Sequence, residues 1–403
     1  MKILFYNHTN QVSGAERVLL LLLSRLNRTR FEATLICPAG GQLQKAARGF
    51  NVPCVEVQQL TARFTWKLRA LFHYLSSFIS TIRQVRTRVR EQQPDLIHAN
   101  SIRAGLVISV ATFGLRIPIV WHVHDLLPAH PLSTCIRWFV LFHPPARIVV
   151  VAQAACDRFK GKVLRVFAAR VKIDVIHNAV DISEVISGHG RSIRRELRLR
   201  NDDKLIGIVG NLSPIKGQLE LLGAFARVRA NFPNSALLVV GSTLFNSDEG
   251  YQQRLHAEVR RLNLESQVRF VGQRDDVPAI MAALDLLVIN SRSEAFPLVA
   301  LEGMAAGVPI LATSVGGLPE LIKHKENGWL IEAGNSEALV SSLNFLLRRP
   351  GLCGDMSKAA GQHVETNHSV PAFIAQVEST YNELHSEVAP LSSEQLALSS
   401  SAS

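Results

Sequence analysis

Cysteine is scarce in this sequence, with five residues among 403 and none in a CxxC pair. Their odd number and wide spacing exclude a disulfide-built domain and predict buried thiols in a reducing compartment. The sequence also lacks any run of about 18 uncharged apolar residues, so it predicts no membrane-spanning helix. Its first residues turn polar within ten positions, which predicts a first strand and not a secretory leader.

Acidic residues are scarce in the first half of the chain. Residues 1–185 hold 24 Lys and Arg against 10 Asp and Glu, a net charge of +14, whereas the remainder holds 20 against 23. Apolar residues make up 47% of the sequence, which excludes a mainly disordered protein, and the length predicts two domains. The uneven charge predicts an anionic partner for the first half: nucleic acid, a phosphorylated ligand or an acidic membrane surface.

Short apolar runs alternate with longer amphipathic segments in two series. The first series of predicted strands is Ile3–Tyr6, Thr34–Cys37, Leu96–His98, Ile119–Val123, Ile148–Val151 and Val175–Ile176. The second is Leu205–Val209, Ala236–Val240, Val268–Val271, Leu286–Ile289, Ile310–Ala312 and Gly328–Ile331. Apolar strands that alternate with helices indicate parallel sheets covered on both faces, so the sequence predicts an α/β protein with two Rossmann-like domains.

The predicted boundaries follow shifts in composition. They are residues 1–183 for the first domain, 184–203 for a polar linker, 204–370 for the second domain, 371–388 for a C-terminal helix and 389–403 for a disordered tail. The tail is rich in Ser and Ala, which is typical of segments that cannot bury a core.

The segment Gly210–Gly217 directly follows a predicted strand and opens a helix. A glycine-containing turn of this kind lets backbone N–H groups face an anion, and Lys216 adds a positive charge. The order of residues is neither a Walker A loop nor GxGxxG. The alternative interpretation is an ordinary strand-to-helix turn with a solvated lysine.

Two glutamates, Glu294 and Glu302, lie eight residues apart after the predicted strand Leu286–Ile289. Pro297 suits the first turn of a helix, with Ser293 or Glu294 as its cap. The two carboxylates would then lie roughly 12 Å apart along the axis, which suits two parts of one extended ligand. The alternative is that Glu294 caps the helix and Glu302 is a solvated helix residue.

Taken together, the two motifs resemble those of the retaining glycosyltransferases of the GT-B fold, family 4. The resemblance covers residues 1–384. Two further segments, Val175–Asp181 and Glu294–Leu321, are also similar to recognisable regions of the family. It implies two Rossmann-like domains that face each other across a cleft, with the last helix crossing back to the first domain. Residues 1–183 would then face the acceptor, and residues 204–370 would bind a nucleotide-sugar.

The resemblance also implies roles for single residues. By position, Glu302 accepts hydrogen bonds from the ribose, Glu294 contacts the donor sugar, and Lys216 and the amides after Glu294 hold the diphosphate. The implied donor-binding residues are Gly14, Gly210, Asn211, Lys216, Glu294, Ala295, Phe296, Pro297, Leu298 and Glu302. No metal and no cofactor is expected, because these groups supply the positive charge for the leaving group.

Three positions depart from the family pattern. Asn211 stands where the family usually has an arginine, which removes one cation from the diphosphate site. Ala295 and Pro297 replace glycines that usually follow Glu294, which narrows the sugar pocket.

His122, His124 and Asp125 follow the predicted strand Ile119–Val123. Ligands of open α/β sheets bind at such strand ends. His124 matches a family histidine that faces the sugar, so His124, Glu294 and Lys216 are the predicted catalytic residues. The alternatives are half of a metal site, for which no partner cluster occurs elsewhere in the sequence, and histidines hydrogen-bonded in the core.

The expected acceptor side lies at other strand ends of the first domain. Ser13, Gly14 and Glu16 resemble the family's first glycine loop, and Gly14 would allow close approach of a ligand. Asn100 and Ser101 follow another strand. The candidate acceptor-side residues are Ser13, Glu16, Asn100, Ser101, His122 and Asp125.

The segment Arg63–Arg90 holds seven Lys and Arg residues, no acidic residue and several aromatic ones. A basic amphipathic helix with aromatic residues is typical of membrane-surface binding. The alternative is a helix packed on the core with a solvated basic edge. No nucleic-acid-binding motif is present, so we expect no nucleic-acid partner.

The resemblance therefore implies a retaining glycosyltransferase, which we expect in the cytoplasm, peripheral to the inner face of a membrane. It would move a hexose or N-acetylhexosamine from a UDP- or GDP-sugar to a saccharide or lipid-linked acceptor. Three alternatives stay open: a GT-B-like nucleotide-sugar epimerase, an NAD-dependent oxidoreductase, which the missing GxGxxG disfavours, and a non-catalytic nucleotide-binding scaffold, which Asn211 alone supports.

Overall fold

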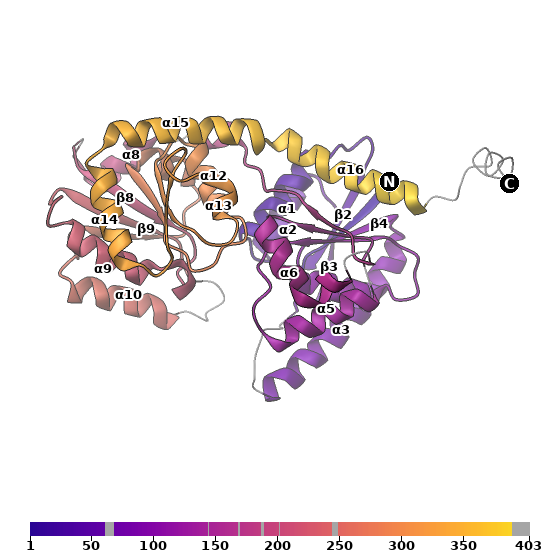
Figure 1. Ribbon diagram of the computed structural model, residues 1–403. Coiled ribbons are helices and arrows are strands. Elements are labelled where there is room, and N and C mark those ends of the chain that lie inside the picture. The colour runs from indigo at the N-terminus through magenta and orange to yellow at the C-terminus, as the bar shows by residue number, and fades with distance from the viewer. Residues whose placement is uncertain are drawn as a thin grey trace. The chain divides into compact units, whose positions relative to one another are not determined.

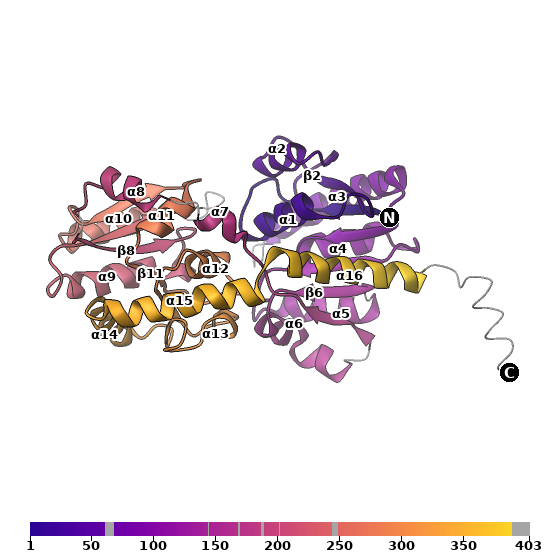
Figure 2. The ribbon, with the colours of Figure 1, turned by 90° about the horizontal axis from the view of Figure 1, so that it is seen from above.

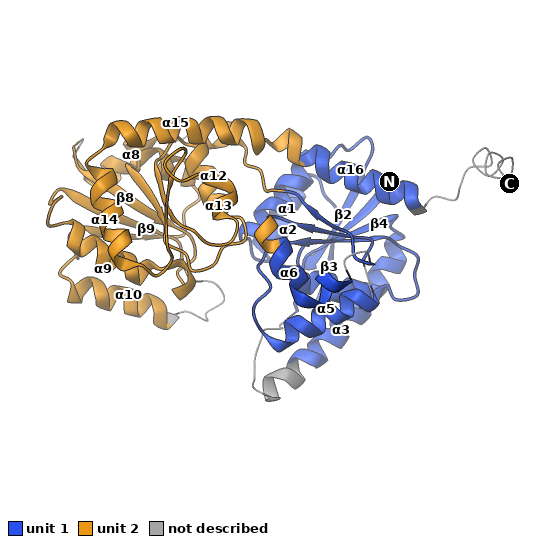
Figure 3. Ribbon diagram, in the orientation of Figure 1, with its two compact units in different colours: residues 1–151, 156–176, 374–403 blue, residues 152–155, 177–373 orange. Residues whose placement is uncertain are grey.

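The computed structural model describes residues 1–60, 68–143, 145–167, 170–186, 189–200, 202–243 and 249–388 (Figure 1). The chain divides into two compact units (Figure 3). Unit 1 comprises residues 1–151, 156–176 and 374–403, and unit 2 comprises residues 152–155 and 177–373. The predicted α/β class with two domains is confirmed, as is the return of the last helix to the first of them.

Unit 1 is built on a seven-stranded parallel sheet with the strand order β3-β2-β1-β4-β5-β6-β7. Its strands are β1 (Lys2–Tyr6), β2 (Glu32–Pro38), β3 (Cys54–Val57), β4 (Leu96–Ala99), β5 (Ile119–Val123), β6 (Arg147–Val150) and β7 (Ile173–Val175). The central strands β4 and β6 are buried along their whole length. Helices therefore cover both faces of this sheet, as continuous apolar strands predict.

The helices of unit 1 are α1 (Gly14–Arg25), α2 (Gln42–Gly49), α3 (Leu68–Gln92), α4 (Ile102–Ala111), α5 (Pro131–Phe142), α6 (Gln153–Val166) and α16 (Val370–Val388). Successive residues of a strand point to opposite faces. On β5, the ring of Trp121 packs against α4, where a Cβ on Gly105 would lie 2.3 Å from it. The next residue, His122, points to the opposite face, beside His98 of β4, which hydrogen-bonds to α16.

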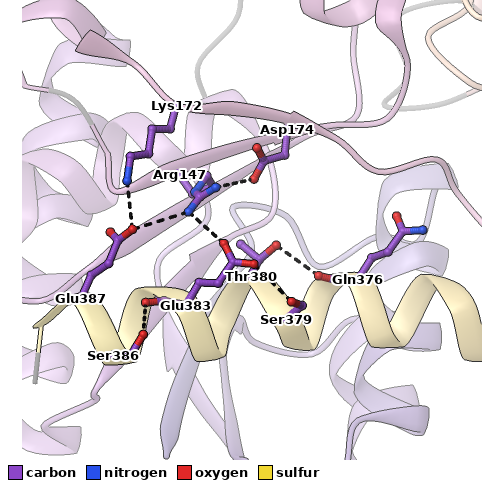
Figure 4. A network of polar contacts seen from close by, with 9 residues as sticks. All are labelled: Arg147, Lys172, Asp174, Gln376, Ser379, Thr380, Glu383, Ser386 and Glu387. Carbon is purple, nitrogen blue, oxygen red and sulfur yellow. Dashed lines mark hydrogen bonds and ion pairs between the residues drawn. The ribbon is translucent and has the colours of Figure 1, made fainter. Parts of the chain in front are cut away.

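Helix α16 lies along the other elements of unit 1 (Figure 2). Charged and polar side chains join it to them (Figure 4). Arg147 of β6 pairs with Asp174 at 2.9 Å and with Glu383 of α16 at 3.3 Å. Lys172 pairs with Glu387 of α16 at 2.9 Å. The helix therefore brings negative charge to the basic first half of the chain.

Unit 2 is built on a six-stranded parallel sheet with the strand order β10-β9-β8-β11-β12-β13. Its strands are β8 (Lys204–Val209), β9 (Ser235–Val240), β10 (Val268–Gly272), β11 (Leu286–Ile289), β12 (Ile310–Thr313) and β13 (Trp329–Ile331). Its helices are α7 (Ile182–Ile186), α8 (Gly190–Glu196), the 3₁₀ turn η2 (Pro214–Lys216), α9 (Gln218–Val228), α10 (Glu249–Arg261), α11 (Val277–Ala283), α12 (Leu298–Ala305), α13 (Leu318–Leu321), α14 (Ser336–Leu347) and α15 (Pro350–Asn367).

Some segments differ from the sequence-based expectations. The described part of residues 184–203 carries the end of α7 and all of α8, within unit 2. The edge strand β3 was not among the predicted strands. Residues 61–67 and 389–403 lie outside the described residues, so the beginning of the Arg63–Arg90 segment and the predicted disordered tail are not described here.

Candidate active site

The predicted donor residues other than Gly14, which begins α1 in unit 1, gather at one edge of the unit 2 sheet. Strand β8 has β9 on one side and β11 on the other, so the strand order reverses at β8 and β11. The carboxyl ends of strands at such a reversal are where open α/β sheets bind ligands. The loop Gly210–Gly217 follows β8, and the loop Asn290–Pro297 follows β11. The structure therefore brings the two sequence motifs together.

Glycines allow the loops after β8 and β9 to approach each other closely. Gly210 and Gly241 have φ values of +145° and +133°, which side chains rarely adopt. A Cβ on Gly241 would lie 2.0 Å from the carbonyl oxygen of Gly210. Gly217 has φ +70°, and a Cβ there would lie 2.2 Å from the carbonyl oxygen of Asn290. The glycines are therefore required by the packing of the protein itself.

Lys216 and Glu294 form an ion pair between the two loops. Lys216 Nζ donates to Glu294 Oε1 at 2.5 Å, and Ser291 Oγ donates to the same oxygen at 2.6 Å. The Glu294 side chain is 9% exposed, while that of Lys216 is 25% exposed. A buried carboxylate needs such partners. The lysine keeps part of its surface free for an incoming anion.

Helix α12 begins later than the sequence predicted. Its N-cap is Pro297, not Ser293 or Glu294, so the expectation that one of these residues caps the helix is wrong. The helix stops at Gly307, whose φ of +69° closes the turn with a hydrogen bond to Met304 O. Glu302 lies on α12 and is 5% exposed, so the alternative interpretation of it as a solvated helix residue is wrong.

The start of α12 presents backbone donors. Among the described residues, the N–H groups of Ala295, Phe296, Leu298 and Val299 have no hydrogen-bond acceptor. Pro297 has no N–H to leave unsatisfied. Free amides at the first turn of a helix attract anions, and the helix dipole adds to that attraction. The loop is thus suited to a phosphate group.

The side chain of Phe296 is turned into the core. It is 4% exposed and stacks on His177 with ring centroids 4.8 Å apart. Asn178 Nδ2 donates to Phe296 O at 3.1 Å. A Cβ on Gly317 would lie 2.1 Å from Ala295 O. The segments Val175–Asp181 and Gly316–Glu320 therefore hold the backbone of residues 295–296 in place, and Phe296 can meet a ligand only through its N–H.

A chain of hydrogen bonds crosses the carboxyl edge of the unit 1 sheet. Asn7, directly after β1, donates to Glu16 Oε1 at 3.2 Å, and Asn100, after β4, donates to Asn7 Oδ1 at 3.1 Å. Asn100 Oδ1 lies 3.0 Å from Nε2 of His124, after β5. Ser13 closes the other end, with its N–H and Oγ both on Glu16 Oε2. Asn7, Glu16 and Asn100 are each at most 3% exposed.

This chain sets the protonation of His124. Asn100 Nδ2 already donates to Asn7, so its Oδ1 must accept, and His124 Nε2 carries the proton. Burial, with His122 and His98 nearby, holds the pKa of His124 well below its usual value. Its Nδ1 is then a bare acceptor, buried and without a hydrogen-bond partner among the described residues. A neutral histidine of this tautomer can accept a hydrogen bond from a hydroxyl.

Three histidine rings lie in a row on the α16 face of the sheet, the first pair edge to face and the second tilted. The ring centroids of His98 and His122 lie 5.2 Å apart, and those of His122 and His124 lie 4.0 Å apart. Tyr381 of α16 hydrogen-bonds to His98 Nδ1 at 2.7 Å. Burial lowers the pKa of His122 to about 3. His122 thus packs in the core beside His124. Its side chain, which was predicted to lie on the acceptor side, is buried.

The other predicted acceptor-side residues differ in what surrounds them. Asp125 is exposed, and Ser101 Oγ accepts from Ala104 N at 3.0 Å as the N-cap of α4. Nothing lies within 4 Å of a Cβ at Gly14. In unit 2, Asn211 is exposed and its carbonyl oxygen accepts from Gln218. Their roles toward a ligand stay predictions.

Residues that the sequence analysis did not single out complete both edges. Asn7 and Tyr381 hold the histidine side of unit 1, and Ser291 and Asn290 hold the lysine loop of unit 2. Asn7, Asn290 and Ser291 directly follow strands, which is a signal that could have found them. Tyr381 is 283 residues from its partner, so no local pattern reveals it.

Comparison with known families decides the identity. Residues 12–184 match the model of Glycosyltransferase Family 4, and residues 191–363 match that of Glycosyl transferases group 1. The chain is a family 4 glycosyltransferase of the GT-B fold. Together the two models cover most of the chain, and they divide it between two α/β units as the fold does.

Relatives of this glycosyltransferase act on different substrates. The N-acetyl-alpha-D-glucosaminyl L-malate synthase of Bacillus anthracis is 28% identical over 209 residues, 52% of this chain and 53% of that protein. The chain thus spans about half the length of that relative. The UDP-Gal:alpha-D-GlcNAc-diphosphoundecaprenol alpha-1,3-galactosyltransferase of Escherichia coli is 24% identical over 347 residues, 82% of this chain and 84% of that protein.

A solved structure is similar over nearly the whole glycosyltransferase. The crystal structure of Anabaena HepE in complex with UDP-glucose has a TM-score of 0.80 and 28% identity, and it covers 95% of this chain and 100% of that chain. Two further observations concern the described residues alone. No group of three or more His, Cys, Asp or Glu side chains is arranged to hold a metal ion, and no helix is long and apolar enough to span a bilayer.

Proposed function

We propose that this protein is a retaining glycosyltransferase that uses a UDP- or GDP-sugar. The observation that carries the proposal is the Lys216–Glu294 pair beside the free amides of residues 295 and 296, at the strand-order reversal of unit 2. Lysine and amides there can neutralise a diphosphate leaving group without a metal. The complex of HepE with UDP-glucose supports a nucleotide-sugar donor.

The roles of the donor residues follow from their surroundings. Lys216 would bind the diphosphate, since its side chain is the partly exposed member of the ion pair. Glu294, held by Lys216 and Ser291, would accept hydrogen bonds from sugar hydroxyls. Glu302 lies on the buried face of α12. It would accept hydrogen bonds from the ribose hydroxyls, as the family resemblance implies. No cofactor enters this scheme.

His124 would act as a neutral acceptor. Its Nδ1 lone pair is buried, and it would take a hydrogen bond from a sugar hydroxyl once side-chain movement uncovers it, while Asn100 fixes the ring through Nε2. The low pKa keeps the ring uncharged at neutral pH, so it does not repel a developing oxocarbenium charge on the sugar. This is a positioning and polarising role, not that of a general base.

The proposed acceptor is a hydroxyl of a saccharide or of a lipid-linked saccharide, and the proposed place of work is the inner face of a membrane. The Escherichia coli relative supports this, since its name describes transfer to a GlcNAc-diphosphoundecaprenol. The donor is proposed to carry a hexose or an N-acetylhexosamine.

A screen of UDP- and GDP-sugars tests the proposal. Each donor is incubated with the protein, and the release of UDP or GDP is measured. NMR determines the anomeric configuration of the sugar in the product. We expect slow hydrolysis or transfer of one donor with retention of the anomeric configuration. Inversion would contradict the retaining mechanism, and conversion of the donor into its epimer without release of nucleotide would favour an epimerase. Lys216→Met should abolish the activity that is found.

A further inference from the structure

Large apolar side chains are exposed mainly in unit 1. Of the twelve that are exposed among the described residues, ten lie in unit 1. Five gather at the ends of α4, α5 and α6, with exposed fractions between 40% and 76%. We call them the aromatic patch: Phe113, Trp138, Phe142, Val166 and Phe167. Soluble monomers rarely expose such a group of side chains without a partner.

Ring contacts connect three members of the patch. Trp138 and Phe142 stack on α5 with centroids 5.8 Å apart, and Trp138 lies 6.4 Å from Phe167 after α6. Phe113 lies 5.7 Å from His143, the residue after Phe142. The guanidinium of Arg137 ties α5 to α6 by donating to the carbonyl oxygens of residues 158 and 159. Helices α5 and α6 lie next to each other (Figure 1), and Arg137 holds α5 to the part of α6 before its break at Gly161.

Positive charge surrounds these rings. Residues 113–172 carry nine Lys and Arg against two Asp and Glu. Lys162 and Arg165 lie within one turn of Val166 on α6, and Arg170 N donates to Phe167 O at 3.0 Å. Arg116 follows Phe113 by three positions. All four of these cations are exposed. The patch thus combines aromatic side chains with a basic rim.

We propose that the aromatic patch and its basic rim bind the surface of an anionic phospholipid bilayer. Aromatic side chains insert at the level of the headgroups, and each Lys or Arg near the surface gains from the negative potential of the lipids. A second copy of this chain is the less suitable occupant. A twofold contact through the patch would bring the rim cations of both copies into one interface, and that concentration of positive charge is repulsive.

This inference deepens the proposed membrane location and rests on it. It assigns the contact to α5, α6 and the end of α4. On α3, Arg86 instead donates to the carbonyl oxygens of Ala111 and Phe113, and Arg88 pairs with Glu91. Arg86 and Arg88 of the Arg63–Arg90 segment therefore have protein partners. In the rim, Arg165 pairs with Asp157 at 3.7 Å, and all four cations lie near exposed apolar side chains.

Vesicle binding by the full chain tests the inference. The protein is sedimented with vesicles of phosphatidylcholine alone, and of equal parts phosphatidylcholine and phosphatidylglycerol, at low and high salt. The variants are Phe142→Ser/Phe167→Ser and Lys162→Gln/Arg165→Gln. Phe50→Ser is the matched control, because Phe50 is an exposed aromatic residue of unit 1 outside the patch. Quenching of Trp fluorescence by brominated phosphatidylglycerol, compared between the wild type and Trp138→Phe, reports insertion of Trp138.

We expect the wild type and Phe50→Ser to bind the anionic vesicles at low salt, and each double variant to bind roughly tenfold more weakly. Equal binding by the double variants would overturn the patch while leaving the membrane location standing. Absence of binding by the wild type at low salt would overturn both. Loss of self-association in the variants, without vesicle binding by the wild type, would assign the patch to a contact between copies. Nucleotide-sugar turnover, measured in parallel, judges the glycosyltransferase function separately.

Discussion

Single side chains of the donor site are held by one another before any ligand arrives. Glu294 takes hydrogen bonds from Lys216 and Ser291 on one oxygen. The pair is only partly exposed, so the charge of Lys216 is less screened by water than that of a surface lysine. An incoming phosphate would compete with Glu294 for Lys216 and free that carboxylate for the sugar.

Removing this cation should weaken the diphosphate part of binding. For Lys216→Met we expect the dissociation constant of UDP or GDP to rise roughly tenfold to a hundredfold, because a charge-assisted hydrogen bond is lost. Binding of the nucleoside alone should not change. Isothermal titration of both ligands measures this difference. Equal weakening of nucleoside and diphosphate would mean that the variant disturbs the fold and not the phosphate contact.

The buried histidines should make stability depend on pH. Burial lowers the pKa of His122 to about 3, below the value of about 6.5 in the unfolded chain. Between these values the unfolded state binds a proton that the folded state does not, so acidification favours unfolding. Stability from this group is complete above pH 6.5 and falls as the pH is lowered toward 3.

Replacing His122 should flatten that dependence. For His122→Asn we expect the slope of unfolding free energy against pH, between pH 6 and 4.5, to drop by about 1.4 kcal/mol per pH unit. Denaturant unfolding at several pH values measures it. His385→Asn on α16 is the control, because the His385 side chain is exposed. An unchanged slope in His122→Asn would contradict a buried neutral His122.

Residue identities were predictable where they follow strands. Glu294, Lys216 and His124 could be placed at strand ends from the sequence because parallel strands end at a common edge. The acceptor-bearing tautomer of His124 could not, since it depends on Asn7 and Asn100 from two other strands. The amide of Phe296 was expected at the donor, and this stays a prediction. The stacking of its ring on His177 was not predictable, because His177 lies far from it in the sequence.

At the scale of elements, turns decide where the site lies. Helix α12 begins at Leu298 because Pro297 serves as the cap and Phe296 is anchored in the core. Proline is usual at the first helical position, which is why the sequence suggested an earlier start. The later start leaves residues 295 and 296 in an open loop whose amides face outward from the helix.

The turn before α13 should control the shape of that loop. For Gly317→Ala, the new methyl group would meet Ala295 O at 2.1 Å, so the donor loop must shift. We expect a loss of roughly 1–3 kcal/mol in unfolding free energy and weaker UDP or GDP binding. In Gly223→Ala, on α9, nothing lies within 4 Å of the new Cβ, and we expect a gain of about 0.5–1 kcal/mol with unchanged binding.

Chemical denaturation and nucleotide titration of both variants distinguish these outcomes. If Gly317→Ala were as stable and bound nucleotide as well as Gly223→Ala, the loop would not depend on this contact.

Strand predictions at this scale were accurate wherever an apolar run was continuous. Strand β3 escaped prediction because its four residues include Glu56, and it lies at the edge of the sheet.

At the scale of the whole molecule, the uneven charge is partly balanced within unit 1. Glu383 and Glu387 of α16 pair with Arg147 and Lys172, so the last helix returns negative charge to the basic half. The remaining positive charge includes the rim of the aromatic patch. Sequence position alone could not show this, because the balancing residues lie more than 200 positions away.

The arginine at the centre of this network should matter more than its exposed partners. The Arg147 side chain is 10% exposed and pairs with Asp174 and Glu383. For Arg147→Met we expect a loss of roughly 2 kcal/mol in unfolding free energy, because carboxylates lose a partly buried partner. Arg88→Met, with a 43% exposed side chain paired to Glu91, should change it by less than about 1 kcal/mol. Equal effects in urea unfolding would contradict the docking role of Arg147.

The central claim is that unit 2 holds a nucleotide diphosphate at the carboxyl ends of β8 and β11. Its most direct test is isothermal titration of the wild type and Glu302→Ala with UDP and with GDP. We predict that the wild type binds one of the two nucleotides and that Glu302→Ala binds it at least tenfold more weakly, while its circular dichroism spectrum stays unchanged. Absence of binding of either nucleotide to the wild type, or equal binding by Glu302→Ala, would contradict the account.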